Sequence, residues 1–333
     1  MKKAEALQLF YEKNHINIDL VSNEEDGNYD ARIANLSSQI DLWLQKIDVD
    51  DHNIFLELLS RYTYLTEAQC QLRYSRIIQL LNEELTALKC ECGLSDVLFV
   101  TVESSGTYKS GSDNVRADFQ KRHLRTIQKT QIVATQSNLA VADICQYKVV
   151  VFIDDIVGSG VTLWNTIKNF CQRFPIVCNG KNNHKLFYAC IAPRKHGLKH
   201  IRKNCKRYNI DAKELFDATW CEEPAINKNS PAYPKIKKYE EIIGNYMMPE
   251  DESFFMGFKN NRLLLSFHYN TPNNTLSSFW RSIPAYPEPP FYRDGNQPKA
   301  GITLDDLQKT KKSMQNASYE LGKCRQRKYS DEQ

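Results

Sequence analysis

The sequence contains no apolar run of the length that crosses a bilayer and no segment of the secretory-signal type. Its start, MKKAEALQLFYEKNHINIDL, is basic but has neither an apolar core of signal length nor a small-residue cleavage site. We therefore expect a protein without membrane spans that works in the cytoplasm. Thiols stay reduced in that compartment, which affects how the cysteines are interpreted.

Cysteine pairs at metal-binding spacing are also lacking. The chain has ten cysteines, but only Cys90 and Cys92 lie close together, and no second pair stands at zinc-finger distance from them. A disulfide framework is not expected in a cytoplasmic protein. We therefore interpret the cysteines as reduced thiols and not as ligands of a metal.

A large excess of one charge is missing as well. The chain has 44 Lys and Arg against 40 Asp and Glu, so its formal net charge is +4. From Lys309 to the end there are seven basic and three acidic residues, so this tail accounts for the whole excess. Two interpretations stay open: a surface for nucleic acid or an acidic partner, or a solvated and partly disordered terminus.

The first 92 residues have helical periodicity and no strand pattern. Apolar residues recur at three- and four-residue steps in DARIANLSSQIDLWLQKI and in TEAQCQLRYSRIIQLLNEELTALK. Asp30 and Thr66 occupy the expected N-cap positions of these two segments. Residues 1–92 are therefore predicted to form a helical N-terminal region.

Short apolar segments rich in β-branched residues begin after residue 92. Strands are expected at 95–103, 131–135, 148–154, 185–192, 214–220 and 262–268, with helical stretches between several of them. This alternation predicts an α/β fold with a mainly parallel sheet. The domain is expected to span 93–298, with a proline-rich run at 281–295 on its surface, followed by a polar basic tail at 299–333.

The stretch VVVFIDDIVGSGVTLWNTI (149–167) joins a buried strand to a helix through two carboxylates and a glycine turn. Ligands of open parallel sheets bind beyond the carboxyl ends of the strands, and a helix N-terminus offers free N–H groups to an anion. The residues of this phosphate cradle are Gly158, Ser159, Gly160, Val161 and Thr162. Asp154 and Asp155 would repel each other unless sugar hydroxyls or Mg²⁺ approached them. The stretch therefore suggests a ribose 5-phosphate group.

The stretch is neither a Walker A loop nor a dinucleotide fingerprint, because it lacks Gly-Lys-Ser/Thr and G-x-G-x-x-G. It resembles the phosphoribosyl pyrophosphate (PRPP) motif of type I phosphoribosyltransferases. The resemblance implies that fold, with Asp154 and Asp155 as catalytic residues that hold the ribose hydroxyls and, through the substrate, Mg²⁺. It also implies that residues 158–162 hold the 5-phosphate. Gly158 departs from the motif, since the family usually has a hydroxyl residue there.

The same resemblance extends to two segments before this motif. The first loop of the family binds pyrophosphate, and here the matching residues are Ser104, Ser105, Gly106, Lys109, Ser110 and Gly111. A hood loop would follow at 115–129, with Arg116, Lys121, Arg122, Arg125 and Lys129 facing the leaving pyrophosphate. An ordinary solvated helix face explains each of these basic residues equally well.

The segment after the last expected strand, HYNTPNNTLSSFW (268–280), sets the chain apart from salvage enzymes. It resembles a phosphoribosyltransferase-like group of bacterial conflict systems, which includes antiphage cassettes and some retrons. The resemblance implies a toxic defence effector acting on nucleotides or PRPP. The residues it places on the acceptor side are His268, Asn270, Asn273, Asn274 and Trp280. The alternative is that the asparagines form local turns and Trp280 is a core residue.

A basic helix is expected beside this site. In APRKHGLKHIRKNCKRYN an apolar stripe is surrounded by Lys199, Arg202, Lys203, Lys206 and Arg207. The segment Lys199–Arg207 could bind a nucleic acid or nucleoprotein partner, with salt-sensitive and weakly specific contacts. Two functions therefore stay open: a phosphoribosyltransferase-type enzyme, or a non-catalytic nucleotide-sensing or nucleoprotein-bound subunit. Oligomers are possible under both.

Overall fold

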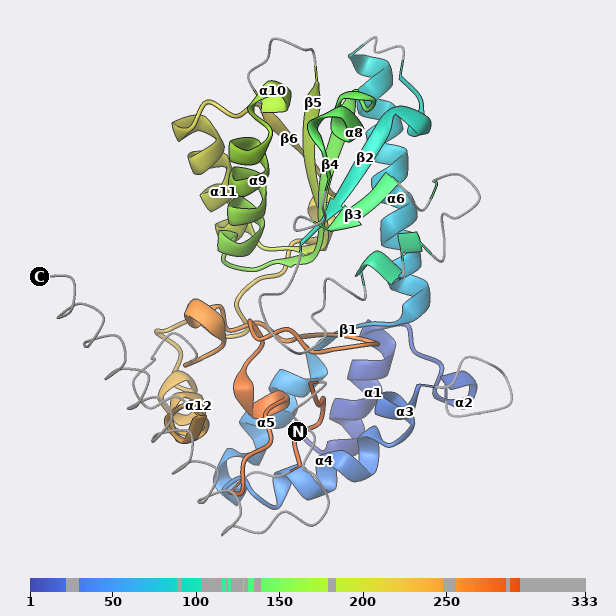
Figure 1. Cartoon of the computed structure of the whole chain (residues 1–333). Helices are drawn as coiled ribbons and strands as arrows, with labels where there is room; N and C mark the ends of the chain where they lie inside the picture. Colours follow the sequence, from blue (N-terminus) through green and yellow to red (C-terminus); the bar gives the residue numbers. More distant parts are fainter. Residues whose placement is uncertain are drawn as a thin grey trace, which may run out of the picture.

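The computed structural model places two halves of the protein one above the other (Figure 1). It describes residues 1–21, 30–88, 92–102, 115–117, 119–120, 128, 131–134, 139–178, 184–247, 255–285 and 288–293. The upper part, here called the sheet half, consists of described residues within 66–222. The lower part, here called the composite half, consists of described residues within 1–65 and 225–293, which come from both ends of the chain.

The sheet half is built on five parallel strands in the order β3-β2-β4-β5-β6. The strands are β2 (Val97–Thr101), β3 (Ile132–Ala134), β4 (Val149–Val157), β5 (Lys185–Pro193) and β6 (Ala212–Leu215). β4 lies in the middle, and Val149 to Ile153 are fully buried, as expected for a parallel strand that is covered on both faces. The predicted α/β fold with a mainly parallel sheet is confirmed.

Helices cover both faces of this sheet (Figure 1). The long helix α6 (Glu67–Ala87) packs on one face, where Ile77 and Leu81 meet Val151. On the other face lie α8 (Val141–Cys145), α9 (Val161–Arg173), α10 (Pro175–Cys178) and α11 (Lys195–Arg207), and here Ile167 and Ile201 pack in one cluster with strand residues. Because parallel strands need crossover connections, these helices link the strands and bury their apolar faces on the sheet at the same time.

The composite half has one core that both ends of the chain form. Its helices are α1 (Lys3–Lys13), α2 (Ile18–Val21), α3 (Ala31–Ala34), α4 (Leu36–Leu44), α5 (His52–Ser60) and α12 (Tyr233–Met247), with 3₁₀ turns η2 (Val49–Asp51), η7 (Phe258–Asn260) and η8 (Ser277–Phe279). The Trp43 ring lies 4.9 Å from that of Phe279, and the Phe10 ring lies 5.8 Å from that of Phe291. The Trp43 Nε1 also donates to the Ser278 carbonyl at 3.0 Å.

A two-stranded parallel sheet joins the two ends of the chain. Its strands are β1 (Thr63–Leu65) and β7 (Leu265–Phe267). Behind it, the buried Tyr62 hydroxyl lies 2.9 Å from Ser266 Oγ, which lies 2.7 Å from Thr271 Oγ1. The absence of a strand from residues 1–92 was therefore a wrong prediction. Three residues give too short a pattern to be recognised beside long helical periods.

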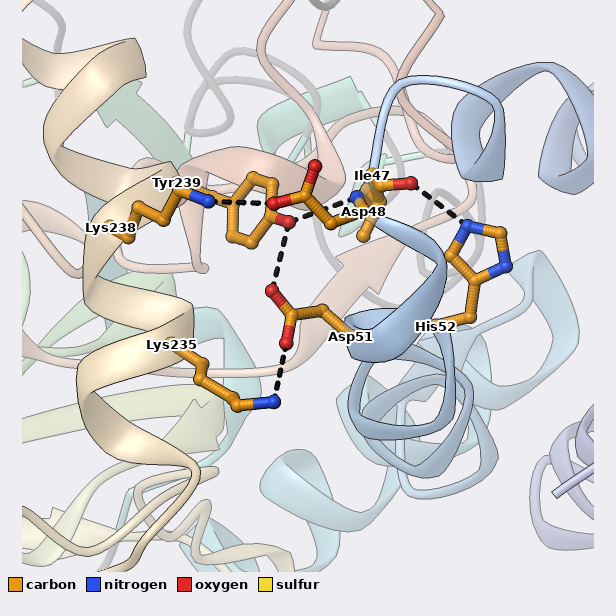
Figure 2. A network of polar contacts seen from close by, with 7 residues as sticks. All are labelled: Ile47, Asp48, Asp51, His52, Lys235, Lys238 and Tyr239. Carbon is orange, nitrogen blue, oxygen red and sulfur yellow. Dashed lines mark hydrogen bonds and ion pairs between the residues drawn. The ribbon is translucent and has the colours of Figure 1, made fainter.

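A polar network around the buried Asp51 and Tyr239 connects α12 to η2 (Figure 2). Asp51 accepts from Lys235 Nζ at 2.7 Å and from the Tyr239 hydroxyl at 3.0 Å. The same hydroxyl accepts from the Asp48 N–H at 3.0 Å, and Lys238 Nζ donates to the Asp48 carboxylate at 2.6 Å. These contacts span nearly two hundred residues of sequence, so they form after the chain has closed on itself.

Several local predictions are confirmed. Asp30 accepts from the Arg32 N–H, and Thr66 forms a capping box with Gln69 at the start of α6. The helix expected from Asp30 is broken at Asn35 into α3 and α4. The expected strand at 214–220 lies earlier, as β6, because Asp217 caps the 3₁₀ turn η5 (Ala218–Trp220).

Other predictions are corrected by the packing. The proline-rich run does not lie entirely on the surface, since Phe291 is fully buried in the composite core. Cys92 and Cys171 each take part in a disulfide. The free thiols are Cys70, Cys145, Cys190, Cys205 and Cys221. The expectation of reduced thiols is therefore wrong for Cys92 and Cys171.

The remaining organisational predictions concern the boundaries and the membrane. Buried residues of α6 share a hydrophobic core with the sheet, and buried residues from Ala6 to Tyr64 share another with residues from Ile226 to Phe291. The predicted domain boundary at residue 92 stays a prediction. The tail at 299–333 lies outside the described residues. Within the described part of the chain, no helix combines the length and the apolar character that a membrane span requires.

Candidate functional site

The turn between β4 and α9 contains a left-handed backbone conformation at Gly160, which glycine adopts without strain. Gly160 is the N-cap of α9 and has φ +77°, the left-handed region that L side chains rarely adopt. The Val161 N–H is 3.4 Å from Ser159 Oγ, and the Trp164 N–H donates to the Gly160 carbonyl at 3.0 Å. A thirteen-residue helix therefore begins immediately after the turn and directs its N-terminal N–H groups there.

The aspartate pair lies inside β4, because this strand continues to Val157, beyond its predicted end at Asp154. Both carboxylates are buried, with Asp154 5% and Asp155 7% exposed. Asp154 Oδ1 accepts from the Asp155 N–H at 3.0 Å, and Asp155 Oδ1 accepts from the Ile156 N–H at 2.8 Å. Burial raises the pKa of Asp155, while the Ile156 N–H, Asp154 and the charge of Arg293 act in the opposite direction.

One side of the turn is closed by close packing. A Cβ on Gly158 would lie 2.4 Å from Asn274 Nδ2, and a Cβ on Gly160 would lie 2.3 Å from the Gly197 carbonyl oxygen. A Cβ on Gly197 would in turn lie 2.4 Å from the Gly158 carbonyl oxygen. The Asn274 carboxamide thus fills the place where a side chain at position 158 would be, which gives the missing hydroxyl residue a physical reason.

The other side of the turn is open. Ser159 and Val161 are partly exposed and Thr162 is exposed, in contrast to the buried Gly158 and Gly160. The hydroxyls of Ser159 and Thr162 therefore stand on the side from which a ligand can reach the start of α9. This arrangement has the elements of an anion cradle: a glycine turn, hydroxyl groups and a helix N-terminus.

Trp280 is packed as a core residue, and its role on the acceptor side stays a prediction. It is 2% exposed and its Nε1 donates to the Thr275 carbonyl at 3.1 Å, as a core residue would. The guanidinium groups of Arg281 and Arg293 lie 5.2 and 5.7 Å from its ring centre. Because the charge of Arg293 also acts on Asp155, the tryptophan and both arginines lie on the side of the aspartate pair.

The other residues of the terminal motif lie elsewhere. His268 contacts Tyr269 edge to face at 4.8 Å and borders a cavity of about 410 Å³ with Arg32 and Tyr292. The Asn270 side chain accepts from the Thr271 N–H at 2.9 Å, a local turn contact. The Asn273 carbonyl accepts from the Phe258 N–H at 2.7 Å. The contacts given for Asn274 and Trp280 are the ones that lead to the turn and to the aspartates.

The predicted pyrophosphate loop lies outside the described residues, and so do Lys121, Arg122, Arg125 and Lys129 of the predicted hood. The loop residues concerned are Ser104, Ser105, Gly106, Lys109, Ser110 and Gly111. Of the hood, Val115 and Phe119 are fully buried, and the Phe119 ring lies 4.9 Å from that of Phe99, whereas Arg116 is exposed. Two hood positions are therefore anchored in the core.

Helix α11 touches the turn through Gly197 and presents its basic residues to solvent. Lys199, Lys203, Lys206 and Arg207 are exposed. Arg202 is different, because it makes a bidentate pair with Glu214, with Nε and Nη2 donating at 2.9 and 2.6 Å. The basic face predicted from the sequence is present, but Arg202 is engaged within the protein.

The donor set fits Mg²⁺ held together with a ligand. No group of three or more His, Cys, Asp or Glu side chains that could hold a metal occurs among the described residues. Mg²⁺ commonly uses one or two carboxylates and completes its shell with phosphate oxygens and water. The paired oxygens of Asp154 and Asp155 match this pattern, so the ion would enter with its phosphate-bearing partner.

Sequence reasoning missed Gly197, Arg281 and Arg293. Gly197 contacts the turn because α11 crosses its backbone, which no spacing in the sequence reveals. Arg281 and Arg293 lie in the run read as surface wrapping. Only Arg281 gave a signal in the sequence, since it directly follows Trp280 and arginines often lie over the face of an aromatic ring.

The comparisons with known proteins agree with this geometry. Residues 40–291 match the model of the family PRTase-CE. The match covers about three quarters of the chain and includes all the described strands, the turn after β4 and the terminal motif. No curated protein and no solved structure matches the sequence.

Proposed function

Because the chain belongs to the PRTase-CE family and is a phosphoribosyltransferase-like protein, we propose that the β4–α9 turn binds the 5-phosphate of a phosphoribosyl compound such as PRPP. The observation that supports this most is the buried aspartate pair, Asp154 and Asp155, followed after a short turn by the left-handed Gly160 at the start of α9. The open hydroxyls of Ser159 and Thr162 would donate to the phosphate. Asp154 and Asp155 would accept from the ribose hydroxyls.

Mg²⁺ would supply positive charge to the phosphate oxygens and to the aspartates. The chain's own part is to hold the sugar and exclude water. Both carboxylates are buried, so contacts made to them are stronger than they would be in water. The backbone N–H groups of Asp155 and Ile156 already orient one oxygen of each carboxylate.

The proposed reaction is exchange of the group at C1 of the ribose. Such a reaction depends on positioning and on stabilising the charge of the departing group. Arg281 and Arg293 stand beside Trp280 on the side of Asp155, where they would face an anionic leaving group. The acceptor is left open.

Calorimetry with PRPP and Mg²⁺ tests the proposal. The double variant Asp154→Asn plus Asp155→Asn should bind about a hundredfold more weakly, because two hydrogen bonds to charged groups are lost. It should keep its fold, since burial already disfavours the charged form of Asp155. Asp211→Asn, at an exposed aspartate, is the matched control. Equal binding by the double variant would sink the assignment.

We also propose that the protein is an antiphage effector that consumes PRPP or modifies nucleotides. The support is the terminal motif, whose Asn274 fills the space beside Gly158, as a specialised form of the turn would require. Induction of wild type should arrest growth and deplete the nucleotide pool, whereas Asp155→Asn should not. Co-expression of the genomic neighbours should relieve the arrest. Arrest that persists in Asp155→Asn would exclude an effect through ribose chemistry.

The second candidate is a nucleotide-sensing or nucleoprotein-bound subunit without turnover. The observation that favours it is Arg293, whose charge already acts on Asp155. A sensor would bind PRPP or a nucleotide and release it unchanged. Incubation of the protein with PRPP and candidate acceptors, followed by analysis of the products, separates the two functions. Pyrophosphate release that depends on Asp155 supports the enzyme, and binding without release supports the sensor.

A further inference from the structure

Arg194 is a buried cation without an acceptor. It follows β5, and its backbone N–H donates to the Val157 carbonyl at 3.0 Å, at the end of β4. The residue is 9% exposed. Its guanidinium makes no hydrogen bond and no ion pair with any residue in the described part of the chain. Burial lowers its pKa, so the charged side chain is held at a cost in free energy.

After burial, the next largest influence on the pKa of Arg194 is the charge of another arginine, from the composite half. Arg262 lowers the pKa of Arg194 further. Both residues border the segment 222–226: the Glu222 N–H donates to the Pro193 carbonyl at 2.8 Å, and the Ala225 N–H donates to the Arg262 carbonyl at 2.7 Å. Two arginines from distant segments are therefore held near each other. The Arg262 guanidinium is fixed in position, because Nη1 and Nε donate to the carbonyls of Ile226 and Asn260 at 2.8 and 3.3 Å.

The surrounding charges do not neutralise this pair. Glu223 acts on Arg194, but it is exposed and its carboxylate is 2.6 Å from Lys195 Nζ. Lys259 adds positive charge near His200 of α11 and lowers the pKa of that histidine. Like charges held together with so little compensation are typical of a site that is complete when an anion is bound.

The segment that holds Arg262 has a strained backbone. Four of its non-glycine residues have φ between 53° and 60°, in the left-handed region: Met256, Lys259, Asn260 and Arg262. Such conformations cost free energy and occur most often where a function requires them. Here the strained residues include Arg262 itself, and the charges of Lys259 and Arg262 act on His200 of α11 and on Arg194.

Arg194 and Arg262 are attached to the closed side of the β4–α9 turn. The Arg194 N–H bonds the residue before Gly158, and the Leu263 N–H, next to Arg262, donates to the Asn274 carbonyl at 3.1 Å. Asn274 is the residue that covers Gly158. The hydroxyls of Ser159 and Thr162, proposed to hold the 5-phosphate, lie on the open side. The arginine pair is therefore a separate place for negative charge.

We propose that Arg194 and Arg262 form an anion-binding site for a phosphoryl group other than the ribose 5-phosphate. Two guanidinium groups match the charge and the oxygen geometry of a phosphate dianion. The inference rests on the proposed function and extends it, because it assigns a second phosphoryl group to the ligand or to its acceptor. A phosphorylated acceptor, such as a nucleotide, fits this pattern better than a free base.

Binding of inorganic phosphate to the full-length chain tests the site. Equilibrium dialysis should show that Arg194→Gln binds one phosphate fewer than wild type, or binds it about tenfold more weakly, the loss expected for a hydrogen bond between charged groups. Lys203→Gln, an exposed change on the same helix, should bind like wild type. Equal stoichiometry and affinity for Arg194→Gln and wild type would overturn the proposal.

Stability separates a binding role from a structural one. Without phosphate, Arg194→Gln should unfold at the same denaturant concentration as wild type or at a higher one, because an uncompensated buried charge is gone. With phosphate, wild type should gain more stability than the variant. A variant that is clearly less stable than wild type in phosphate-free buffer would assign Arg194 a structural role and contradict the proposal.

The two proposals fail in different experiments. The Asp154→Asn plus Asp155→Asn variant should keep the phosphate that depends on Arg194. If PRPP binding does not depend on the aspartates, the proposed function fails while the arginine site stands. If phosphate binding does not depend on Arg194 while PRPP binding needs the aspartates, the arginine site alone fails.

Discussion

The sheet half and the composite half differ in how far apart in the sequence their contacts lie. In the sheet half, neighbouring strands such as β5 and β6 are joined by one crossover helix, α11. In the composite half, Arg32 Nη1 donates to the Phe267 carbonyl at 2.7 Å across 235 residues of sequence, and Trp43 bonds Ser278 across the same separation. The first half can form locally, whereas the second requires both ends of the chain.

This difference explains why the site is divided. The sheet half supplies the aspartates and the glycine turn, which are found by their pattern. The composite half supplies Asn274, Trp280 and Arg293, which reach the turn and the aspartates because the chain closes beneath the sheet. The aspartates and the glycine turn are thus one half of the site. The residues of the composite half that lie against them are placed there by long-range packing.

The largest effect is expected from a change in the core of the composite half. Trp43→Ala should lower the free energy of unfolding by about 3–5 kcal/mol, the usual cost of truncating a buried aromatic residue. Trp43 is 2% exposed and contacts Phe55 and Phe279. Chemical denaturation measures the loss. The neighbouring Leu42→Ala, at a side chain 43% exposed, should change stability by less than about 1 kcal/mol.

A similar cost for the two changes would show that the core does not lie where the packing places it. The comparison is well matched, because Leu42 and Trp43 are adjacent residues of the same helix, α4. A difference between them therefore reports burial and not helix propensity.

The next effect tests the junction of the two halves. Gly158→Ala should cost about 1–3 kcal/mol, as overpacking does, because the new Cβ would lie 2.4 Å from Asn274 Nδ2. Asn274→Ala removes the side chain that the new Cβ would meet. The cost of Gly158→Ala should therefore be clearly smaller in the Asn274→Ala variant than in wild type. A double-mutant cycle from denaturation curves gives the coupling. Strict additivity would mean that the two residues are not in contact.

A smaller effect is expected from the polar network of the composite half. The hydrogen bond from Lys235 lowers the pKa of Asp51, while burial opposes it. The folded pKa therefore lies below the unfolded value of about 3.9, so this stabilisation is present above that pH and is lost as the pH falls through the folded pKa. Lys235→Met should cost about 1 kcal/mol at neutral pH.

Denaturation curves between neutral and acidic pH check the sign. Asp51→Asn should flatten the loss of stability on acidification, whereas the exposed neighbour Asp50→Asn should leave it unchanged. The same dependence of stability on pH in Asp51→Asn and in wild type would contradict the assignment of Asp51.

The smallest effect on the fold is expected from the exposed face of α11. Replacing Lys199, Lys203 and Lys206 by Gln should change stability by less than about 0.5 kcal/mol and leave PRPP binding intact. Binding to a generic duplex should become weaker and less dependent on salt. Arg202 is left unchanged because it is paired with Glu214. Unchanged duplex binding at low salt would show that this face is simply solvated.

The sequence predicts the sheet half well because its signals are local. A continuous apolar run identifies β4, Thr66 marks the start of α6, and the glycine turn identifies the cradle. The sequence misses β1 and the break at Asn35, since three residues or one residue carry too little periodicity to be seen. It also ends β4 at Asp154, because nothing in the composition shows that this strand continues to Val157.

The composite half and its share of the site resist prediction for another reason. Arg262, Arg293 and Gly197 become neighbours of the turn or of the aspartates through contacts between segments, and such contacts leave no spacing in the sequence. Phe291 lies in a proline-rich run that reads as surface, yet it stacks on Tyr62 with ring centres 4.4 Å apart. Closing the chain on itself creates this core.

Hydrogen exchange of the wild-type chain, with and without PRPP and Mg²⁺, tests most directly whether the ligand binds between the two halves. The account predicts slower exchange in two regions at once: residues 155–163 around the turn, and residues 257–281 of the composite half, which cover it. The Asp154→Asn plus Asp155→Asn variant should show neither change. Protection confined to the turn, or protection that the double variant retains, would contradict the account.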